Sequence, residues 1–402
     1  MHAIGANLLE NLLNADNGGY RGATIVCEQG HRPQFVNYRE KKLLTVLGEV
    51  AVKRAYYHDK KCRRGFCPKD NTLDIVATSY SPGVRRLISK VGAMRPFGLG
   101  HQDLQELAGI RVNAKEVERV SQMVGAQVEE FYSRQAEAVL PDKIIPIKAH
   151  RRLYISMDGT GVPVVKRETV DRRGKDGVQA KTREAKLGCV FTQTTVDEEG
   201  RPIRDEQSTS YIGAIEVADN LAKRLYKEAK RRGIDRANDV CVIGDGAHWI
   251  WNIADEQFHG ACQIVDLYHA REHYWTVARA CFKSKDEQNQ WAGERRLELN
   301  DGHVEAVITA IEALREGDNE LCAREIGYFE KNKERMRYAE FRARGLFVGS
   351  GVMEAGCRTV VGQRLKQSGM HWTVDGANKI ITVRCSLLSH HWEDFWEWRA
   401  AV

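Results

Sequence analysis

Residues 152–158 read RLYISMD and residues 239–245 read DVCVIGD. Each stretch is a short apolar run that ends in aspartate and is followed by glycine, a pattern typical of a buried strand that enters a turn. They predict an α/β segment over residues 141–260. Its other predicted elements are strands at 187–194 and 209–215 and a helix at about 217–232, with a further buried strand at 262–266.

The composition narrows the class of protein. A chain of 402 residues allows about two to four domains, and 42% hydrophobic with 29% charged residues excludes disordered, collagen-like and coiled-coil chains. The net charge of +6 permits a nucleic-acid partner without requiring one. We expect no membrane span and no signal peptide. The ten cysteines are scattered, mostly in apolar patterns, which favours buried thiols and a cytoplasmic location.

Two carboxylates stand at the ends of the quoted strands. Asp158 and Asp245 supply oxygen ligands, which hard divalent cations prefer, and the glycine after each would let a phosphate backbone approach. A plain Asp-Gly turn is the other interpretation of each. A third carboxylate, Glu354, lies in the first turn of a predicted helix that Gly-Ser-Gly introduces at 349–351.

Longer motifs surround the three carboxylates and extend over nearly the whole chain. They are YREKKLLTVLGEVAVKRAYYH (38–58), SPGVRRLISKVGAMRPF (81–97), SMDGTGVPV (156–164), REAKLGCVFTQ (183–193), VIGDGAHWIWN (242–252), QIVDLYHAREHYW (263–275) and GSGVMEAGCRTVVGQRLKQSGMHW (349–372). In these motifs the chain resembles the ISKra-type insertion-sequence transposases, which belong to the DDE group.

The resemblance implies an α+β fold in three parts. A small β subdomain similar to a zinc ribbon would occupy residues 1–80, and a helical helix-turn-helix domain would occupy 81–145. An RNase H-like catalytic domain with a mixed central sheet would follow at 146–402. The charged, amphipathic stretch after Tyr268 would form a helical insertion at about 270–345.

The resemblance also implies an activity. Asp158, Asp245 and Glu354 would be the catalytic triad and would hold two Mg²⁺ or Mn²⁺ ions. The enzyme would bind the terminal inverted repeats of its element and hydrolyse phosphodiester bonds there. The freed 3′-hydroxyl would then attack a phosphodiester of the target DNA, so that the element's end is joined to one target strand while the 3′-oxygen of the other side leaves. Double-stranded DNA and further copies of the chain would be its partners, with no membrane and no small-molecule substrate. A catalytically idle DNA-binding protein and a non-transposing RNase H-like nuclease are the alternatives.

Asp266 and His269 form an Asp-x-x-His pair directly after a predicted strand. In transposases with helical insertions, such a pair lies at this place and is taken to help position DNA or the active site. A capping aspartate with a buried, hydrogen-bonded histidine is the equally weighted alternative.

Helical patterns between residues 102 and 124 predict a helix-turn-helix. Gly109 interrupts the pattern, and Asn113 with Glu116 three residues later is a helix start signal. Asn113, Lys115 and Arg119 would then enter a DNA groove, although plain helical hairpins have the same pattern. The predicted phosphate contacts nearby are Arg85, Arg86, Lys90 and Arg95. Near Glu354, the predicted DNA contacts are Arg364, Lys366 and Trp372.

Cysteine and histidine spacing in the first 80 residues suggests a zinc site. Cys27, His31, Asp59 and Cys62 would be the ligands, with His58 as an alternative to Asp59. The family pattern has cysteine where Asp59 stands, so the set is imperfect, and Cys67 would be a neighbour. The other interpretation is a β subdomain with ordinary thiols that folds without metal.

Overall fold

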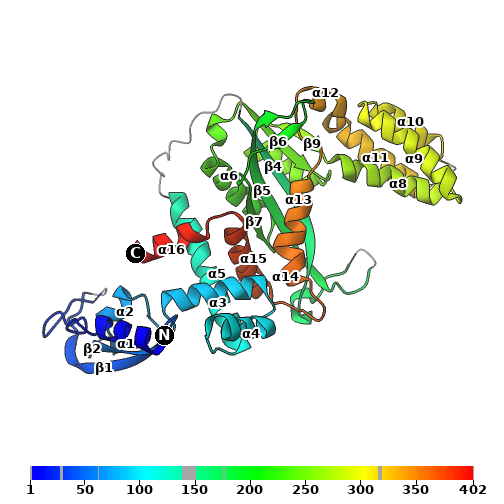
Figure 1. Ribbon diagram of the computed structural model, residues 1–402. Coiled ribbons are helices and arrows are strands. Elements are labelled where there is room, and N and C mark those ends of the chain that lie inside the picture. Colours follow the sequence, from blue (N-terminus) through cyan, green and yellow to red (C-terminus); the bar gives the residue numbers. More distant parts are fainter. Residues whose placement is uncertain are drawn as a thin grey trace. The chain divides into compact units, whose positions relative to one another are not determined.

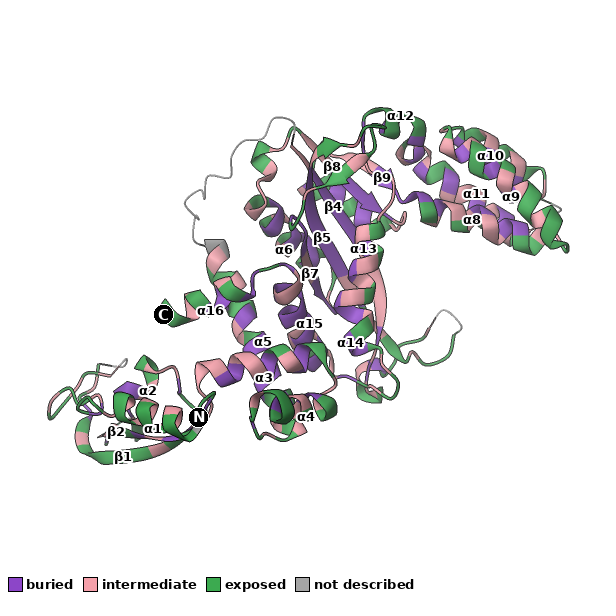
Figure 2. Cartoon of the chain, in the orientation of Figure 1, coloured by how far each residue is buried: buried purple, intermediate pink, exposed green. Residues whose placement is uncertain are grey.

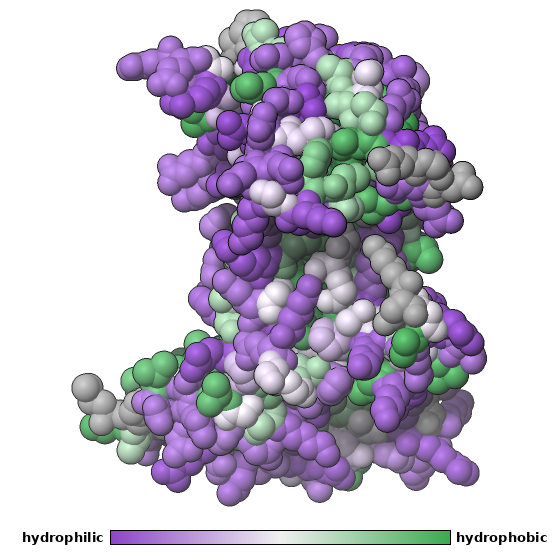
Figure 3. Space-filling view, turned by 90° about the vertical axis from the view of Figure 1, so that its right-hand side faces the viewer, coloured by the Kyte–Doolittle hydropathy of each residue, from purple (hydrophilic) through white to green (hydrophobic). Residues whose placement is uncertain are grey.

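A computed structural model describes residues 2–27, 30–61, 63–137, 151–174, 177–315 and 319–401 (Figure 1). The chain divides into two compact units, one of residues 1–129 with 393–402 and one of residues 130–392. Among the described residues, none of the helices combines the length and hydropathy needed to cross a bilayer. The face of the molecule in Figure 3 carries mostly hydrophilic side chains.

The first unit begins with a helix on a three-stranded antiparallel sheet. Strands β1 (Gln34–Thr45), β2 (Gly48–Asp59) and β3 (Arg64–Phe66) lie in the order β1-β2-β3. Helix α1 (His2–Leu13) packs on β2. Their apolar side chains enclose a core that contains Leu43, Val50, Val52 and Ile75.

Local signals determine the helices that follow. These are α2 (Pro68–Thr72), α3 (Pro82–Met94), α4 (Phe97–Ala108) and α5 (Ala114–Glu137). The Ser81 hydroxyl accepts a hydrogen bond from the Val84 amide at the start of α3. Gly109 ends α4 with φ 66°, and the Asn113 side chain accepts from the Glu116 amide at 2.9 Å. The predicted start and stop signals are thereby confirmed.

The second unit contains a mixed six-stranded sheet, which confirms the α+β class. The strand order is β6-β5-β4-β8-β9, with β7 paired to β5. Strand β4 is antiparallel to β5 and parallel to β8. The strands are β4 (Arg152–Pro163), β5 (Thr182–Val196), β6 (Pro202–Arg204), β7 (Ser210–Ala214), β8 (Asp239–Gly244) and β9 (Cys262–Val265). Figure 2 shows that buried residues concentrate on the central strands.

Helices cover both faces of this sheet (Figure 1). Leu187 and Gly188 are neighbours on β5 and therefore face opposite sides. A Cβ on Gly188 would lie 2.9 Å from Leu225 of α6 (Ala218–Arg231), and a Cβ on Gly356 of α13 (Gly351–Gly356) would lie 3.6 Å from Leu187. Helix α6 therefore covers one face and α13 the other.

The remaining helices complete the unit. After β8 come α7 (His248–Gln257), α8 (Leu267–Cys281), α9 (Lys285–Asn300), α10 (Val304–Glu312), α11 (Glu320–Asn332) and α12 (Tyr338–Ala343). Helices α8 to α11 pack on one another, where the sequence predicts a helical insertion. After α13 come a π-helix η4 (Cys357–Gly362), α14 (Gln363–Leu365) and α15 (Val374–Leu388). The last helix, α16 (Trp392–Ala401), belongs to the first unit except for its first residue. Short 3₁₀ turns are η1 (Lys166–Thr169), η2 (Ile234–Arg236) and η3 (Lys333–Met336).

Candidate active site

The sheet register places Asp158 and Asp245 side by side. Ser156 of β4 pairs with Ile243 of β8, and the two strands are parallel. Each aspartate follows its paired residue by two positions, so the two carboxylates lie at one level of the sheet. Asp158 also pairs with Leu187 of β5, and directly paired residues share a face. Because Leu187 lies on the face that α13 covers, Asp158 lies on that face too.

The surroundings of Asp158 affect its charge. The Gly159 amide donates to Oδ1 at 2.6 Å, and the Cys357 thiol donates to Oδ2 at 3.3 Å. Burial raises the pKa of the Asp158 carboxyl above its usual range, and the charge of Asp245 raises it further, while Cys357, Gly159 and His269 oppose the shift. Two neighbouring carboxylates supply the oxygen ligands that a hard divalent cation prefers, so the pair is chemically suited to share a cation.

Asp245 begins a turn after β8, and Tyr328 of α11 holds this turn by a hydrogen bond. Its Oδ1 accepts from the Ala247 amide at 2.8 Å, and the Tyr328 hydroxyl donates to its backbone carbonyl at 2.9 Å. Gly246 has φ 101°, and a Cβ there would lie 2.6 Å from the Tyr328 ring. The turn therefore requires glycine for its conformation and for its close contact with α11.

Glu354 is exposed in α13, which packs on β4 and β5. A Cβ on Gly356 would lie 2.6 Å from Tyr211, so the close approach of α13 to the sheet depends on this glycine. Cys357, which contacts Asp158, follows Glu354 by three residues, or about 4.5 Å along a helix axis. Within the described part of the chain, however, Asp158, Asp245 and Glu354 are not a group whose oxygens all lie within 4.8 Å.

A π-helix begins at Cys357, directly after the turn that carries Glu354. A π-helix contains an extra residue per turn and displaces carbonyls from their usual partners. The buried Arg384 of α15 donates through Nε to the Val360 carbonyl at 2.7 Å and through a terminal nitrogen to the Thr359 carbonyl. Arg384 therefore satisfies carbonyls of the irregular segment.

Asp266 has the capping role that the sequence left as one of two interpretations. It is 2% exposed, and its Oδ1 accepts from the Tyr268 and His269 amides at the start of α8. Its Oδ2 accepts from the Ser350 amide, one residue before α13. Asp266 thus connects α8 to the segment that introduces Glu354. His269 is only half-buried, with a side chain that is 42% exposed, and its charge acts on Asp158.

Comparison with known proteins adds no family to this geometry. No protein-family model matches the chain, and no curated protein matches it either. The motifs and the site geometry are therefore the basis for any functional proposal.

Two predicted DNA contacts must be corrected. Arg364 is 0% exposed and lies over the Trp372 ring at 5.0 Å, and Trp372 is 7% exposed and donates to the Leu365 carbonyl. These side chains pack against each other, so neither is accessible to DNA in this structure. Lys366 is exposed, and its ammonium donates to the Thr160 hydroxyl.

The helical region of the first unit gives a similar result. Asn113, Lys115 and Arg119 are exposed at the start of α5, although Asn113 caps the helix and Arg119 pairs with Glu116 at 2.7 Å. Arg85 is 1% exposed and pairs with Asp74. The predicted phosphate contact of Arg85 is therefore wrong, because its guanidinium stabilises the interior.

Three of the four predicted zinc ligands lie together. Cys27, His31 and Asp59 have ligand atoms that all lie within 4.8 Å of one another, the one such group of three among the described residues. Asp59 ends β2 on its buried face, whereas His58 lies on the other face, so Asp59 is the better candidate of the two. The fourth predicted ligand, Cys62, lies outside the described residues.

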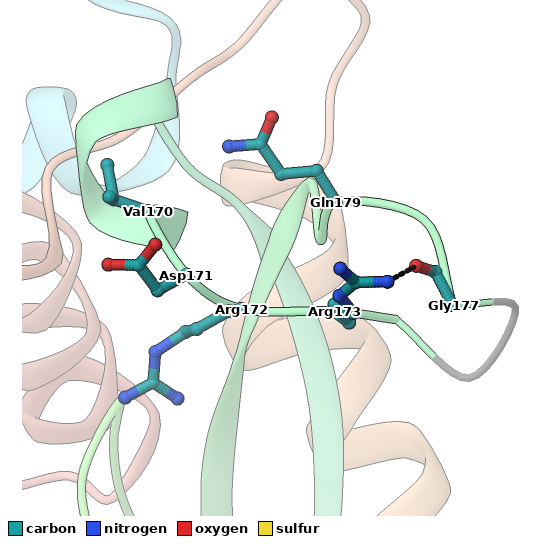
Figure 4. Close-up of a pocket in the computed structure, with 6 residues that line it drawn as sticks. All are labelled: Val170, Asp171, Arg172, Arg173, Gly177 and Gln179. Carbon is teal, nitrogen blue, oxygen red and sulfur yellow. Dashed lines mark hydrogen bonds between the residues drawn. The ribbon is translucent and has the colours of Figure 1, made fainter.

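A separate cavity of about 710 Å³ lies beside the loop after η1 (Figure 4). Val170, Asp171, Arg172, Arg173, Gly177 and Gln179 line it. Arg173 donates to the Gly177 carbonyl at 3.4 Å, the dashed contact in Figure 4. We assign this cavity no role.

Proposed function

We propose that the chain is a DDE transposase of RNase H-like fold that cuts and joins the DNA ends of an insertion sequence. The observation that supports this most is the alignment of Asp158 with Asp245 on neighbouring parallel strands. Glu354, on a helix that reaches Asp158 through Cys357, is the natural third carboxylate. The order of the three along the chain agrees with the motif resemblance.

The donor set fits hard divalent cations. Asp158 and Asp245 would hold Mg²⁺ or Mn²⁺, and Glu354 would be the third carboxylate that the resemblance implies. Two such ions, when bound, would activate a water or a 3′-hydroxyl and stabilise the leaving oxygen of a phosphodiester. The protein itself fixes Asp158 through Gly159 and Cys357, and it fixes the Asp245 turn through Tyr328.

The DNA partner would be recognised by both units. Exposed Lys115 and Arg119 on α5 are candidates for reading the terminal repeats, and exposed Lys366 is a candidate for contact near the scissile bond. Joining two ends would require at least two copies of the chain. We also propose that Cys27, His31 and Asp59 bind a structural zinc ion, with Cys62 as the fourth ligand that the resemblance implies.

A plasmid cleavage assay tests the proposal. Purified protein is incubated with Mg²⁺ and a supercoiled plasmid that carries the two ends of the element. Asp158→Asn, Asp245→Asn and Glu354→Gln remove the three charges with little change of shape. Glu256→Gln, an exposed acid on α7, is the matched control.

The expected result is metal-dependent nicking at the ends by the wild type and by Glu256→Gln. Each of the three site variants should lose at least about 100-fold in rate, the scale expected for removing a group that stabilises the transition state. Binding to the ends with no cleavage by any protein would support the idle DNA-binding alternative. Cleavage that ignores the ends would support a general nuclease.

A further inference from the structure

A cavity lies directly beside the Asp245 turn, between α7 and α11. Its volume is about 660 Å³, within the range of about 300–1,000 Å³ that is common for ligand sites. Gly246, the residue after Asp245, is part of its lining. The α7 wall contributes His248, Asn252 and Asp255, and the α11 wall contributes Arg324, Tyr328 and Lys331.

Basic groups outnumber acidic groups in the lining. Arg324, Lys331 and Arg335 face a single carboxylate, Asp255. Arg324 pairs with the buried Glu325, and the charge of Asp255 acts on Arg335. Lys331 is exposed, and within the described chain no carboxylate lies within 4.0 Å of its ammonium. The cavity therefore carries a net positive charge that protein carboxylates neutralise only in part.

The aromatic rings of the cavity are already covered. Trp251 is 6% exposed, has Arg335 over its ring at 4.7 Å and donates to the Asn332 side chain. The Tyr328 ring stacks on His273 with centroids 3.5 Å apart, and its hydroxyl is bonded to Asp245. Little aromatic surface is left for a base to stack on, whereas ammonium, guanidinium and amide donors remain, which suit phosphate.

We propose that this cavity binds backbone phosphates of the DNA strand next to the bond that is cut. The inference rests on the proposed function, because it assumes that Asp245 is catalytic. Gly246, the residue that follows Asp245, lines the cavity. It adds that α11 contributes sequence-independent contacts through Lys331 and Arg324. Tyr328 would keep the phosphate-binding wall in register with the Asp245 turn, since it belongs to both.

Binding measurements on charge-matched variants test the proposal. Lys331→Gln removes the exposed cation of the cavity. Lys333→Gln removes an equal charge two residues later, at a lysine that pairs with Glu330 and does not line this cavity. Both variants are first compared with the wild type in thermal unfolding. Binding to a short fluorescent duplex of arbitrary sequence is then followed by anisotropy over a series of salt concentrations.

One lost phosphate contact reduces the slope of log K against log salt by roughly 0.9. Lys331→Gln should show this reduction, with affinity about five- to tenfold weaker at 0.1 M salt, and Lys331→Glu should bind more weakly still. Lys333→Gln should bind within about twofold of the wild type.

The outcomes separate this inference from the proposed function. Equal slopes for the wild type and Lys331→Gln, in a protein that cleaves plasmid ends, would overturn the phosphate site and leave the transposase proposal standing. A reduced slope in a protein that never cleaves would support the site and count against the enzyme. A wild type that binds no DNA would overturn both.

Discussion

His391 is a buried histidine with cationic neighbours. It is 7% exposed, and its Nδ1 lies 3.1 Å from the Tyr132 hydroxyl. Burial, together with the nearby charges of Arg231, Arg232 and His390, lowers the pKa of His391 to about 2. Glu228, 4.0 Å from Nε2, has the opposite influence but does not outweigh them.

This depressed pKa predicts acid sensitivity of the second unit. The unfolded chain binds a proton at this histidine below about pH 6.5, whereas the folded chain keeps the ring neutral. The free energy of unfolding should therefore fall as the pH decreases below that value. The contribution of His391 is about 2 kcal/mol between pH 6.5 and pH 5.

Urea unfolding of wild type and variants at pH 7 and pH 5 measures this contribution. His391→Gln retains a partner for Tyr132 and should lose less stability on acidification than the wild type does. His259→Gln, which replaces an exposed histidine, should behave as the wild type. Equal acid sensitivity in all three proteins would contradict the assignment.

At the scale of elements, the helix from α13 through η4 to α14 is the least regular part of the site. Arg384 compensates for its π-helical turn by donating to the Thr359 and Val360 carbonyls. Replacing Arg384 with methionine would leave the buried Val360 carbonyl and the partly buried Thr359 carbonyl without these donors, at about 1–3 kcal/mol for a fully buried group. We therefore predict that Arg384→Met lowers the free energy of unfolding by about 2–5 kcal/mol.

The control for this prediction lies on the same helix. Lys379 of α15 pairs with Asp375 in an i, i+4 ion pair, and the Asp375 side chain is 72% exposed. Lys379→Gln should change stability by about 0.5 kcal/mol or less. Chemical denaturation of both variants is the measurement. Similar stabilities for the two would show that Arg384 does not support the π-helix.

Regular elements with local signals could be predicted from the sequence. The strands that became β4, β5, β7, β8 and β9 were predicted from apolar runs, and the caps at Ser81 and Asn113 from single residues. The short β6 was missed because three residues carry no periodicity. The alignment of Asp158 with Asp245 could not be predicted, because it depends on which residues of β4 and β8 pair, and no local pattern in the sequence determines that register.

The misassigned site residues share one cause. Arg364 follows Glu354 in the chain and was expected at the DNA surface, but its helix turns it inward against Trp372. Tyr328 was not singled out, because its role depends on a contact with Asp245, 83 residues earlier. A side chain whose role depends on a distant partner leaves no local pattern.

At the scale of the whole molecule, the division into two compact units predicts that zinc stabilises only one of them against unfolding. The cluster of Cys27, His31 and Asp59 lies in the first unit, and the carboxylates lie in the second. Metal that binds only the folded form stabilises the unit that contains the site. We predict that zinc raises the unfolding temperature of one calorimetric transition and leaves the other unchanged.

Two cysteine variants control this prediction. Cys27→Ser should abolish the zinc-dependent shift, whereas Cys281→Ser, in α8 of the second unit, should retain it. Mass spectrometry under native conditions measures the zinc content of each protein. A zinc shift that survives in Cys27→Ser would contradict the proposed ligand.

The hydrogen bond between Cys357 and Asp158 joins residues that are 199 positions apart. At a synthesis rate of about 5–20 residues per second, Asp158 is made roughly 10–40 s before Cys357. Throughout that time the nascent sheet lacks the helix that covers this carboxylate. Ribosome-bound chains that stop before residue 357 should therefore leave Asp158 open to solvent, and the site is among the last parts of the protein to assemble.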